Sequence, residues 1–318
     1  MRFATVWDKD AGTRCGLVDG EMLHRLPAGM TLLDLLWSEQ LHSAGDIALR
    51  TGDSAPLAGL RLIPPLEPPT VRDFVAFEEH VEGVVRSVSG GTEVPPEWFE
   101  APTFYFANPY AVIGAHDDVA VPPGCVALDF ELEVAAIIGR AGRDLTPDAA
   151  RDHIAGYTIF NDWSARDLQR REMKVGLGPC KGKDFATTLG PVLVTADELE
   201  PWRDEDGFLA LGMTVEVNGI EIGRDLLSNM GWPFEELVAY ASRGTEVRPG
   251  DVLGSGTCGN GGCLAERWGR HSADITGLRP GDVVTMTVEG IGTITNTVVA
   301  GRDPVKIPTA RQRPRTRP

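Results

Sequence analysis

The chain has 318 residues, a hydrophobic content of 42% and a formal net charge of −16. This length and composition predict a soluble globular protein with one sizeable core and at most a small accessory domain. The acidic charge argues against nucleic-acid binding, because neutralising phosphates requires basic patches, and basic residues cluster only in the tail at 311–317.

The sequence indicates neither export nor membrane anchoring. The N-terminus has no apolar signal region, and no later run approaches the ~20 apolar residues of a membrane span. The five cysteines are scattered and form no CxxC pair, which argues against both a disulfide framework and a zinc site. We therefore expect a cytoplasmic protein with reduced thiols.

Glycine and proline residues divide the chain into parts. Short strand-like pieces, a turn at Asp19-Gly20 and a helical stretch at 32–41 precede the proline-rich segment 63–69. We place a boundary at this segment. The predicted parts are a small N-terminal α+β domain at 1–66, a large domain at 67–306 and a basic, disordered tail at 307–318.

In the large domain, predicted strands outnumber predicted helices. Asn218-Gly219 between two apolar runs is a strong signal for a two-residue β-hairpin. Many strands with few crossover helices predict an α+β fold, mainly β and largely antiparallel. The predicted strands include 135–138, 192–194, 213–217 and 283–288, and the predicted helices are 77–88, 147–153, 164–173 and 233–242.

Carboxylates occupy every second position of the run 128–134, which otherwise has the composition of a buried strand. Because successive side chains of a strand point to opposite faces, Asp129, Glu131 and Glu133 would share one face. Like charges on one face repel unless a hard divalent cation such as Mg²⁺, Mn²⁺ or Ca²⁺ collects them. The alternative is a half-exposed strand with a solvated acidic face.

Other polar residues extend this picture. Asp162 follows an apolar strand, where its side chain either projects into a cleft or caps the next helix. Arg166 and Gln169 lie about one turn apart on that helix, so they face either the same cleft or the same solvent. His80 is one of only six dispersed histidines. This composition favours a cation site made of oxygen ligands alone.

Several motifs in one order resemble the fumarylacetoacetate hydrolase family over roughly 71–299. The matching segments are Arg72-Asp73-Phe74 with His80, Phe104-Tyr105, 128–133, 161–167 with Gln169, 182–188 and 254–257. The resemblance implies a mixed β-roll catalytic domain, here 67–306, behind a smaller N-terminal domain. It also implies a homodimer and one divalent cation, for which we expect Mg²⁺, with Mn²⁺ or Ca²⁺ as alternatives.

The resemblance also implies which residues hold the cation. Glu131, Glu133 and Asp162 match the family's three central metal ligands. Asp73 matches a fourth carboxylate ligand that is typical of the hydrolase branch. The positions that surround these ligands match Asp129 and Thr187.

The catalytic residues implied by the resemblance are His80 as general base, Glu266 as the acid that orients it, and Lys183. Acylpyruvase-like and decarboxylase-like relatives resemble one another in a His-x-x-Glu pair on a lid helix, but this chain has Gly83 at the place of that glutamate. Glu82 is one position off and would point about 100° away on a helix, so it is only an alternative partner for His80. The substrate-contacting positions match Tyr105, Arg166, Gln169 and Thr257.

The implied activity is hydrolysis of a carbon–carbon bond in a 2,4-diketo acid of the fumarylacetoacetate, fumarylpyruvate or acylpyruvate type, in the catabolism of aromatic compounds. The alternative is a metal-dependent isomerase or decarboxylase of a 2-oxo-dioate, similar to 2-hydroxyhepta-2,4-diene-1,7-dioate isomerase or oxaloacetate decarboxylase. A structural protein with a calcium-stabilised strand would instead predict that Glu131→Gln lowers thermal stability without loss of turnover.

Overall fold

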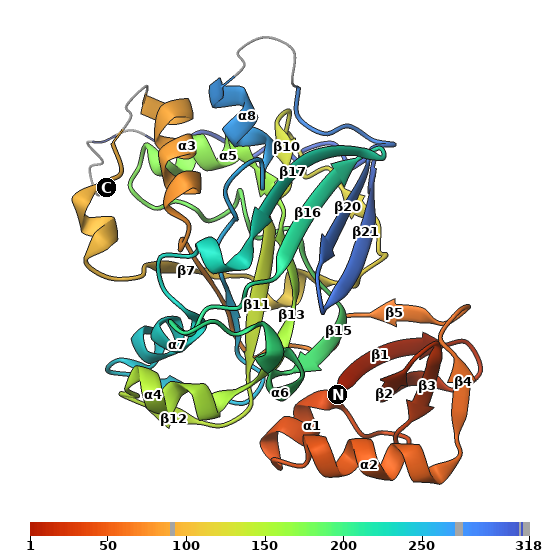
Figure 1. The fold of residues 1–318 in the computed structure, drawn as a ribbon. Coiled ribbons are helices and arrows are strands. Elements are labelled where there is room, and N and C mark those ends of the chain that lie inside the picture. Colours follow the sequence, from red (N-terminus) through yellow and green to blue (C-terminus); the bar gives the residue numbers. More distant parts are fainter. Residues whose placement is uncertain (90–92, 271–275, 312, 314–318) are drawn as a thin grey trace, which may run out of the picture.

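A mixed sheet of twelve strands runs through the described part of the chain (Figure 1). The structure is a computed structural model that describes residues 1–89, 93–270, 276–311 and 313. Along its main path the sheet contains β4 (Ser54–Pro56), β3 (Met22–Arg25), β2 (Gly12–Asp19), β1 (Arg2–Asp8), β15 (Thr187–Thr195), β13 (Ile154–Asp162), β11 (Leu132–Ile138), β19 (Val252–Gly254), β6 (Val71–Phe74) and β7 (Phe104–Ala107). Beside this path, β5 (Arg61–Ile63) pairs with β1, and β8 (Val112–Ile113) pairs with β15.

A second sheet packs against β13 and β15. Its strands are β17 (Ile220–Leu226), β16 (Gly212–Val217), β20 (Val283–Val288), β21 (Gly292–Val299) and β9 (Val119–Ala120). Two short ladders join β10 (Leu128–Asp129) to β14 (Ser164–Ala165) and β12 (Gly142–Arg143) to β18 (Glu246–Val247). The tight turn between β16 and β17 has positive φ at both Asn218 and Gly219, so the predicted hairpin is confirmed.

The helices lie around the sheets. Near one end, α3 (Glu78–Ser89) packs beside α8 (Leu264–Arg270) (Figure 1). The other α-helices are α1 (Leu32–Trp37), α2 (Leu41–Thr51), α4 (Pro147–Ala150), α5 (Arg166–Met173), α6 (Ala196–Leu199) and α7 (Phe234–Ser242). Single 3₁₀ turns occupy Pro96–Phe99, Pro109–Ala111, Arg151–His153, Glu200–Trp202 and Leu227–Asn229.

The predicted fold class, α+β and mainly β, is confirmed. The four helices predicted in the large domain are present, although α5 begins only at Arg166 because the two preceding residues form β14. The helix predicted at 32–41 is wrong in extent. It ends at Trp37, where the Ser38 N–H bonds back to carbonyls of the helix and Glu39 takes a positive φ of 54°, and α2 then starts as a separate helix.

The N-terminal segment joins the central sheet directly. Arg2 and Phe3 of β1 pair with Val194 and Leu193 of β15, so the segment shares a continuous sheet with the rest of the chain. The boundaries of the three predicted parts stay predictions. Residues 307–311 of the tail are exposed and have no helix or strand, while 312 and 314–318 lie outside the described residues. Within the described ranges, no helix combines the length and apolar character needed to cross a membrane.

Both faces of β11 are buried. Ala135 and Ile137 pack into a core shared with α1 and α2, whereas Val134, Ala136 and Ile138 pack into the core beneath the second sheet. The acidic residues just before and within this strand are buried too. The alternative of a half-exposed strand with a solvated acidic face is therefore wrong.

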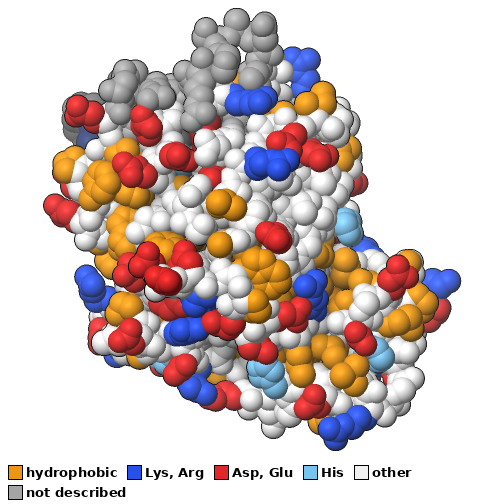
Figure 2. Space-filling view, in the orientation of Figure 1, with side chains coloured by type: hydrophobic (Ala, Val, Ile, Leu, Met, Phe, Trp, Pro, Cys, Tyr) orange, Lys and Arg blue, Asp and Glu red, His pale blue; other side chains and the backbone are white. Residues whose placement is uncertain are grey.

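Positively and negatively charged side chains are mixed on the face of the molecule in Figure 2. Figure 2 shows Lys and Arg side chains scattered among acidic and apolar ones over the face that it presents. This distribution is in keeping with the expectation that the protein does not bind nucleic acid, which stays a prediction.

Candidate active site and metal centre

Three of the four predicted metal ligands lie on β6, β11 and β13 of the central sheet, and Glu131 directly precedes β11. Asp73 of β6 pairs with Gly254 of β19 on one side and with Tyr105 of β7 on the other. Asp162 is the last residue of β13 and pairs with the first residue of β15. Between these strands, Glu133 lies near the start of β11. Sheet register thus brings together carboxylates that are far apart in the sequence.

The carboxylates form a buried cluster. One oxygen each of Asp73, Glu131 and Glu133 lies within 4.8 Å of the other two. The Lys183 ammonium joins Asp162 to this group, because it donates to Asp162 Oδ2 at 2.6 Å and also to Glu131. All four carboxylates are at most 4% exposed, so water does not screen their mutual repulsion.

Asp162 does not cap the helix that follows it. It belongs to β13, and the N-cap position of α5 is Ala165. The capping alternative is therefore wrong, and the side chain instead lies buried in the carboxylate cluster.

Burial and charge shift the pKa values of these groups in different directions. Burial raises the pKa of Asp162 to about 7, even though Lys183 opposes the shift. Burial likewise raises the pKa of Asp73, and burial with the nearby Asp73 charge raises that of Glu133. The positive charges of Lys183 and Arg166 outweigh the effect of burial on Glu131 and hold its pKa well below the usual range. The cluster therefore resists carrying four negative charges unless a cation is added.

The residues fit a hard divalent cation. Asp73 Oδ1, Asp162 Oδ1 and Thr187 Oγ1 are buried and have no hydrogen-bond partner among the described residues. The Tyr105 hydroxyl lies 2.7 Å from Asp73 Oδ2 and also contacts Asp162, although its one hydrogen serves only one of them. A Cβ on Gly254 would lie 2.5 Å from Asp73 Oδ1. Unsatisfied, converging carboxylate oxygens suit Mg²⁺, Mn²⁺ or Ca²⁺.

Arg166 and Asp129 form a buried pair beside the cluster. Arg166 donates to Asp129 Oδ2 from Nε at 2.9 Å, to Glu131 Oε1 from Nη2 at 2.7 Å, and to Gln169 Oε1 at 3.2 Å. Asp129 also accepts the backbone N–H groups of residues 264 and 265 at the start of α8. Arg166 and Gln169 thus face the same cleft, and Asp129 supports Arg166 from behind.

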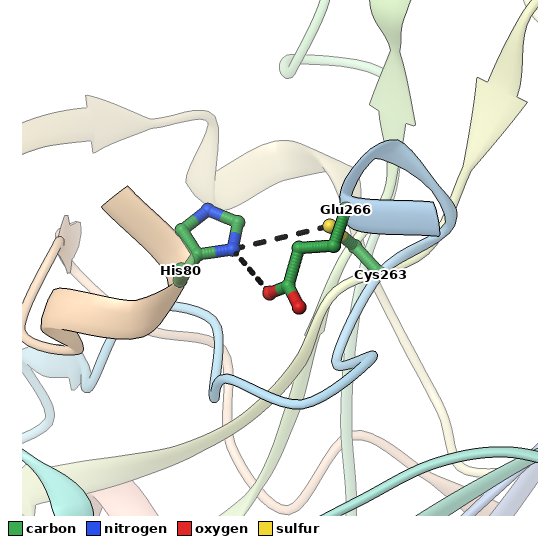
Figure 3. Close-up of side chains that lie close together, drawn as sticks. All are labelled: His80, Cys263 and Glu266. Atoms are coloured by element: carbon green, nitrogen blue, oxygen red, sulfur yellow. Dashed lines mark hydrogen bonds and ion pairs between the residues drawn. The ribbon is translucent and has the colours of Figure 1, made fainter. Parts of the chain in front are cut away.

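His80 of α3 pairs with Glu266 of α8. His80 Nδ1 lies 3.0 Å from Glu266 Oε1 (Figure 3). The other oxygen of Glu266 accepts the Gly261 N–H at 2.9 Å. His80 Nε2 lies 4.0 Å from Glu131 Oε1, so the free side of the ring faces the carboxylate cluster. Of the two acids considered as partners, Glu266 is the one at hydrogen-bond distance from His80.

Gly83 explains why Glu266 has room beside the histidine. A Cβ at position 83 would lie 3.0 Å from Glu266 Cγ, closer than ordinary contact. The glycine that breaks the His-x-x-Glu pattern therefore provides the space that an acid from another helix fills.

A pocket of about 190 Å³ opens onto this arrangement. Its volume suits a small substrate, since sites for drug-sized ligands enclose about 300–1,000 Å³. Thr257, whose hydroxyl donates to Glu133 Oε1 at 3.3 Å, forms part of the wall. The other predicted site residues in the wall are Asp73, His80, Tyr105, Glu131, Arg166, Gln169 and Lys183.

Some residues of the site were not singled out from the sequence. Gly254 allows the carboxylates to approach, the Gly256 N–H donates to Glu133 Oε2 at 3.1 Å, and the Cys263 thiol lies 3.9 Å from His80 Nδ1. Gly254 and Gly256 lie in the segment 254–257, which resembles the family. That resemblance was the feature of the sequence from which their presence in the site could have been predicted. Nothing in the sequence spacing points to Cys263.

Metal binding to this cluster is expected to stabilise the protein more at higher pH. Between the ordinary value of 3.8 and the raised value of about 7 for Asp162, the folded metal-free protein holds a proton that the unfolded chain has lost, so its stability falls as pH rises. A bound cation displaces that proton. At a free metal concentration of 100 Kd, binding stabilises the folded state by about 2.7 kcal/mol. The rise in Tm on adding metal should therefore be larger at pH 8 than at pH 5.5.

Thermal denaturation with Mg²⁺ or Mn²⁺ checks this expectation. Glu133→Gln should lose most of the metal-induced rise, whereas Glu246→Gln, at an exposed ion pair remote from the cluster, should keep it. A rise in Tm that is equal at both pH values would contradict the expectation.

Comparisons with known proteins show which family the chain resembles. Residues 70–299 match the family described as fumarylacetoacetate (FAA) hydrolase, C-terminal. The chain is 29% identical over 313 residues to a fumarylacetoacetase of Arabidopsis thaliana, covering 82% of this chain and 74% of that protein. It is 29% identical over 245 residues to an oxaloacetate tautomerase of Bacillus subtilis (strain 168), covering 76% of this chain and 74% of that protein.

A solved structure supports the fold. The maleylpyruvate hydrolase of Sphingobium sp. SYK-6, determined in complex with manganese(II) ion and pyruvate, superposes with a TM-score of 0.70 at 22% identity, covering 95% of this chain and 100% of that chain. From the match over 70–299, the chain belongs to the fumarylacetoacetate hydrolase family.

Proposed function

We propose that the protein is a hydrolase that cleaves a carbon–carbon bond of a 2,4-diketo acid with a divalent cation, Mg²⁺ or alternatively Mn²⁺ or Ca²⁺, held by Asp73, Glu131, Glu133 and Asp162. The observation that carries the proposal is the orientation of His80. Its Nδ1 meets Glu266 at 3.0 Å, while its Nε2 faces the carboxylate cluster at the pocket wall. A base so placed can take a proton from a water molecule in the pocket.

In the proposed reaction, His80 takes a proton from water and later returns it to the leaving fragment. Nε2 accepts a proton from water, and the hydroxide adds to the distal carbonyl carbon of the substrate. The bond between that carbon and the neighbouring CH₂ then breaks, and its electron pair remains on the 2-oxo acid fragment as an enolate. The His80 imidazolium returns the proton to this fragment, so the products are a carboxylic acid and a 2-oxo acid. Glu266 stabilises the imidazolium in between.

The surrounding residues bind and orient the substrate. When bound, the cation supplies Lewis-acid stabilisation of negative oxygen on the 2-oxo acid portion. Lys183 and Gln169 offer donors to developing oxyanions from the pocket wall. Arg166, fixed by Asp129, presents a cationic surface to the substrate carboxylate. The remaining proposed substrate contacts are Tyr105 and Thr257.

A second candidate is an isomerase, tautomerase or decarboxylase that uses the same cation site without adding water. The similarity to the Bacillus subtilis oxaloacetate tautomerase supports it as well, since the chain is 29% identical to that protein over 245 residues and 29% identical to the fumarylacetoacetase of Arabidopsis thaliana over 313. The stabilisation of an enolate serves all these reactions, so the bound substrate decides between them.

Product analysis separates the two candidates. The purified protein with Mg²⁺ or Mn²⁺ is incubated with acylpyruvates, fumarylpyruvate and oxaloacetate, and product masses are followed together with absorbance. Hydrolysis gives two fragments whose summed mass exceeds that of the substrate by one water. An unchanged mass or release of carbon dioxide, with no such fragments from any substrate, would replace the hydrolase proposal by the second candidate.

The proposal includes the remaining expectations from the sequence. These are a homodimer, a cytoplasmic location and a substrate from the catabolism of aromatic compounds. Sedimentation of the purified chain tests the first of them.

Gly83→Ala is expected to lower kcat by about tenfold while the fold stays intact. The new methyl group would press against Glu266 Cγ, at 3.0 Å, and shift the carboxylate that orients His80; a misplacement approaching 1 Å costs up to about 10²-fold. Alanine is also a better helix former than glycine by about 1 kcal/mol, so Tm should not fall in parallel. Glu78→Ala, on the exposed side of α3, is the matched control, and equal kcat values for both variants would speak against the role of Glu266.

A further inference from the structure

His80, Cys263 and Glu266 form a compact cluster of three different metal-ligating side chains (Figure 3). One ligand atom from each lies within 4.8 Å of the other two. His80 Nδ1 lies 3.9 Å from Cys263 Sγ and 3.0 Å from Glu266 Oε1. The residues His80, Cys263 and Glu266 are 7%, 0% and 1% exposed, respectively. Cys263 is 183 positions from His80, so a search for CxxC pairs does not detect this cluster.

The distances are close to those of a tetrahedral zinc site. With Zn–N of about 2.0–2.1 Å and Zn–S of about 2.3 Å, tetrahedral geometry separates nitrogen and sulfur by ~3.5 Å and nitrogen and oxygen by ~3.3 Å. The observed separations of 3.9 Å and 3.0 Å need shifts of less than about half an ångström. Thiolate and imidazole ligands favour softer ions such as Zn²⁺ over Mg²⁺ or Ca²⁺.

We propose that His80, Cys263 and Glu266 form a second metal site, distinct from the carboxylate cluster, that takes Zn²⁺ or a similarly soft divalent cation and inhibits the enzyme. The Cys263 thiol loses its proton on coordination. The carboxylate and thiolate together match the charge of the cation. The nearby Arg166 guanidinium forms an ion pair with Asp129, 2.8 Å away.

Inhibition follows from the two ring nitrogens of His80. A cation on Nδ1 displaces the hydrogen bond to Glu266, and the neutral, coordinated imidazole then carries its proton on Nε2. Nε2 is the nitrogen that faces the carboxylate cluster, so it is no longer able to accept a proton from water. The binding itself does not depend on the proposed function, but the inhibition rests on it. His80 also forms part of the pocket wall.

Cobalt(II) provides a direct readout of the proposed site. The protein is saturated with Mg²⁺ and titrated with Co²⁺, and the near-ultraviolet thiolate-to-cobalt charge-transfer absorption is recorded. All variants carry Cys180→Ser, because Cys180 is an exposed thiol. We expect the absorption to saturate at one equivalent, to vanish in Cys263→Ser, and to persist in Cys258→Ala, a buried cysteine outside the cluster. Co²⁺ in the carboxylate cluster has no sulfur ligand and does not contribute.

Zinc inhibition is measured in the same proteins, each relative to its own rate without zinc. Cys263→Ser should raise the zinc concentration for half inhibition by about tenfold or more, since even residues that only support metal ligands contribute about 10–100-fold to affinity. Cys258→Ala should leave it unchanged. Absence of the charge-transfer absorption, or its persistence in Cys263→Ser, would overturn the proposal. The absorption without hydrolysis of any substrate would leave the second site standing and refute the proposed function instead.

Discussion

Replacing His80 by alanine is expected to lower kcat for carbon–carbon bond hydrolysis by about 10²–10⁴-fold, the usual contribution of a positioned general base. The reason is geometric. Nε2 faces the carboxylate cluster, and Nδ1 is held by Glu266, which itself accepts the Gly261 N–H. Glu266→Gln should have a smaller effect of the same kind, because the amide holds the ring but does not stabilise its positive charge. Steady-state kinetics with a 2,4-diketo acid provides the measurement.

Metal affinity is the control for this prediction. His80 is not among the proposed ligands of the cation in the carboxylate cluster, and its Nε2 lies 4.0 Å from Glu131 Oε1, so Mg²⁺ or Mn²⁺ binding by calorimetry should change little in His80→Ala. Loss of turnover together with loss of metal would indicate a collapsed site. Full turnover in this variant would refute the role of His80 and favour a reaction without activated water.

Sequence patterns within a few neighbouring residues predicted much of the fold. The Asn218-Gly219 turn and the alternating strands around it depend on local backbone preferences, and the structure has them. The helix α2 was missed, although residues 41, 44, 45 and 48 form its buried stripe. Apart from Leu41, this stripe consists of alanine and glycine, because Gly45 packs closely against Met1 and Phe3. A helix face made of small residues gives a weak hydrophobic signal.

The site was predictable only in part, for a different reason. The carboxylate run and the family motifs named the residues, but alternation alone did not show that both faces of β11 are covered. That burial depends on α1 and α2 on one side and the second sheet on the other. Contacts such as Gly83 with Glu266 or Cys263 with His80 join distant segments. Their spacing in a single sequence carries no information about them.

Replacing Arg166 by methionine is expected to lower the free energy of unfolding by about 3–5 kcal/mol, the cost of breaking a buried ion pair from one side. Arg166 is 8% exposed and donates to Asp129 and Glu131. Its removal leaves the Asp129 carboxylate, which is fully buried, with backbone donors as its remaining partners. Denaturant unfolding in the absence of metal provides the measurement.

The double variant Asp129→Asn/Arg166→Met separates the lost attraction from the cost of the unpaired charge. The neutral amide still accepts a backbone N–H, so the double variant should be more stable than Arg166→Met alone, with a coupling of about 0.5–3 kcal/mol between the two sites. Arg140→Met breaks an exposed pair with Glu39 and should change stability little, because solvent screens that pair. Additive losses in the double variant would mean that Asp129 and Arg166 stabilise the fold independently, and that Asp129 does not position Arg166 at the pocket.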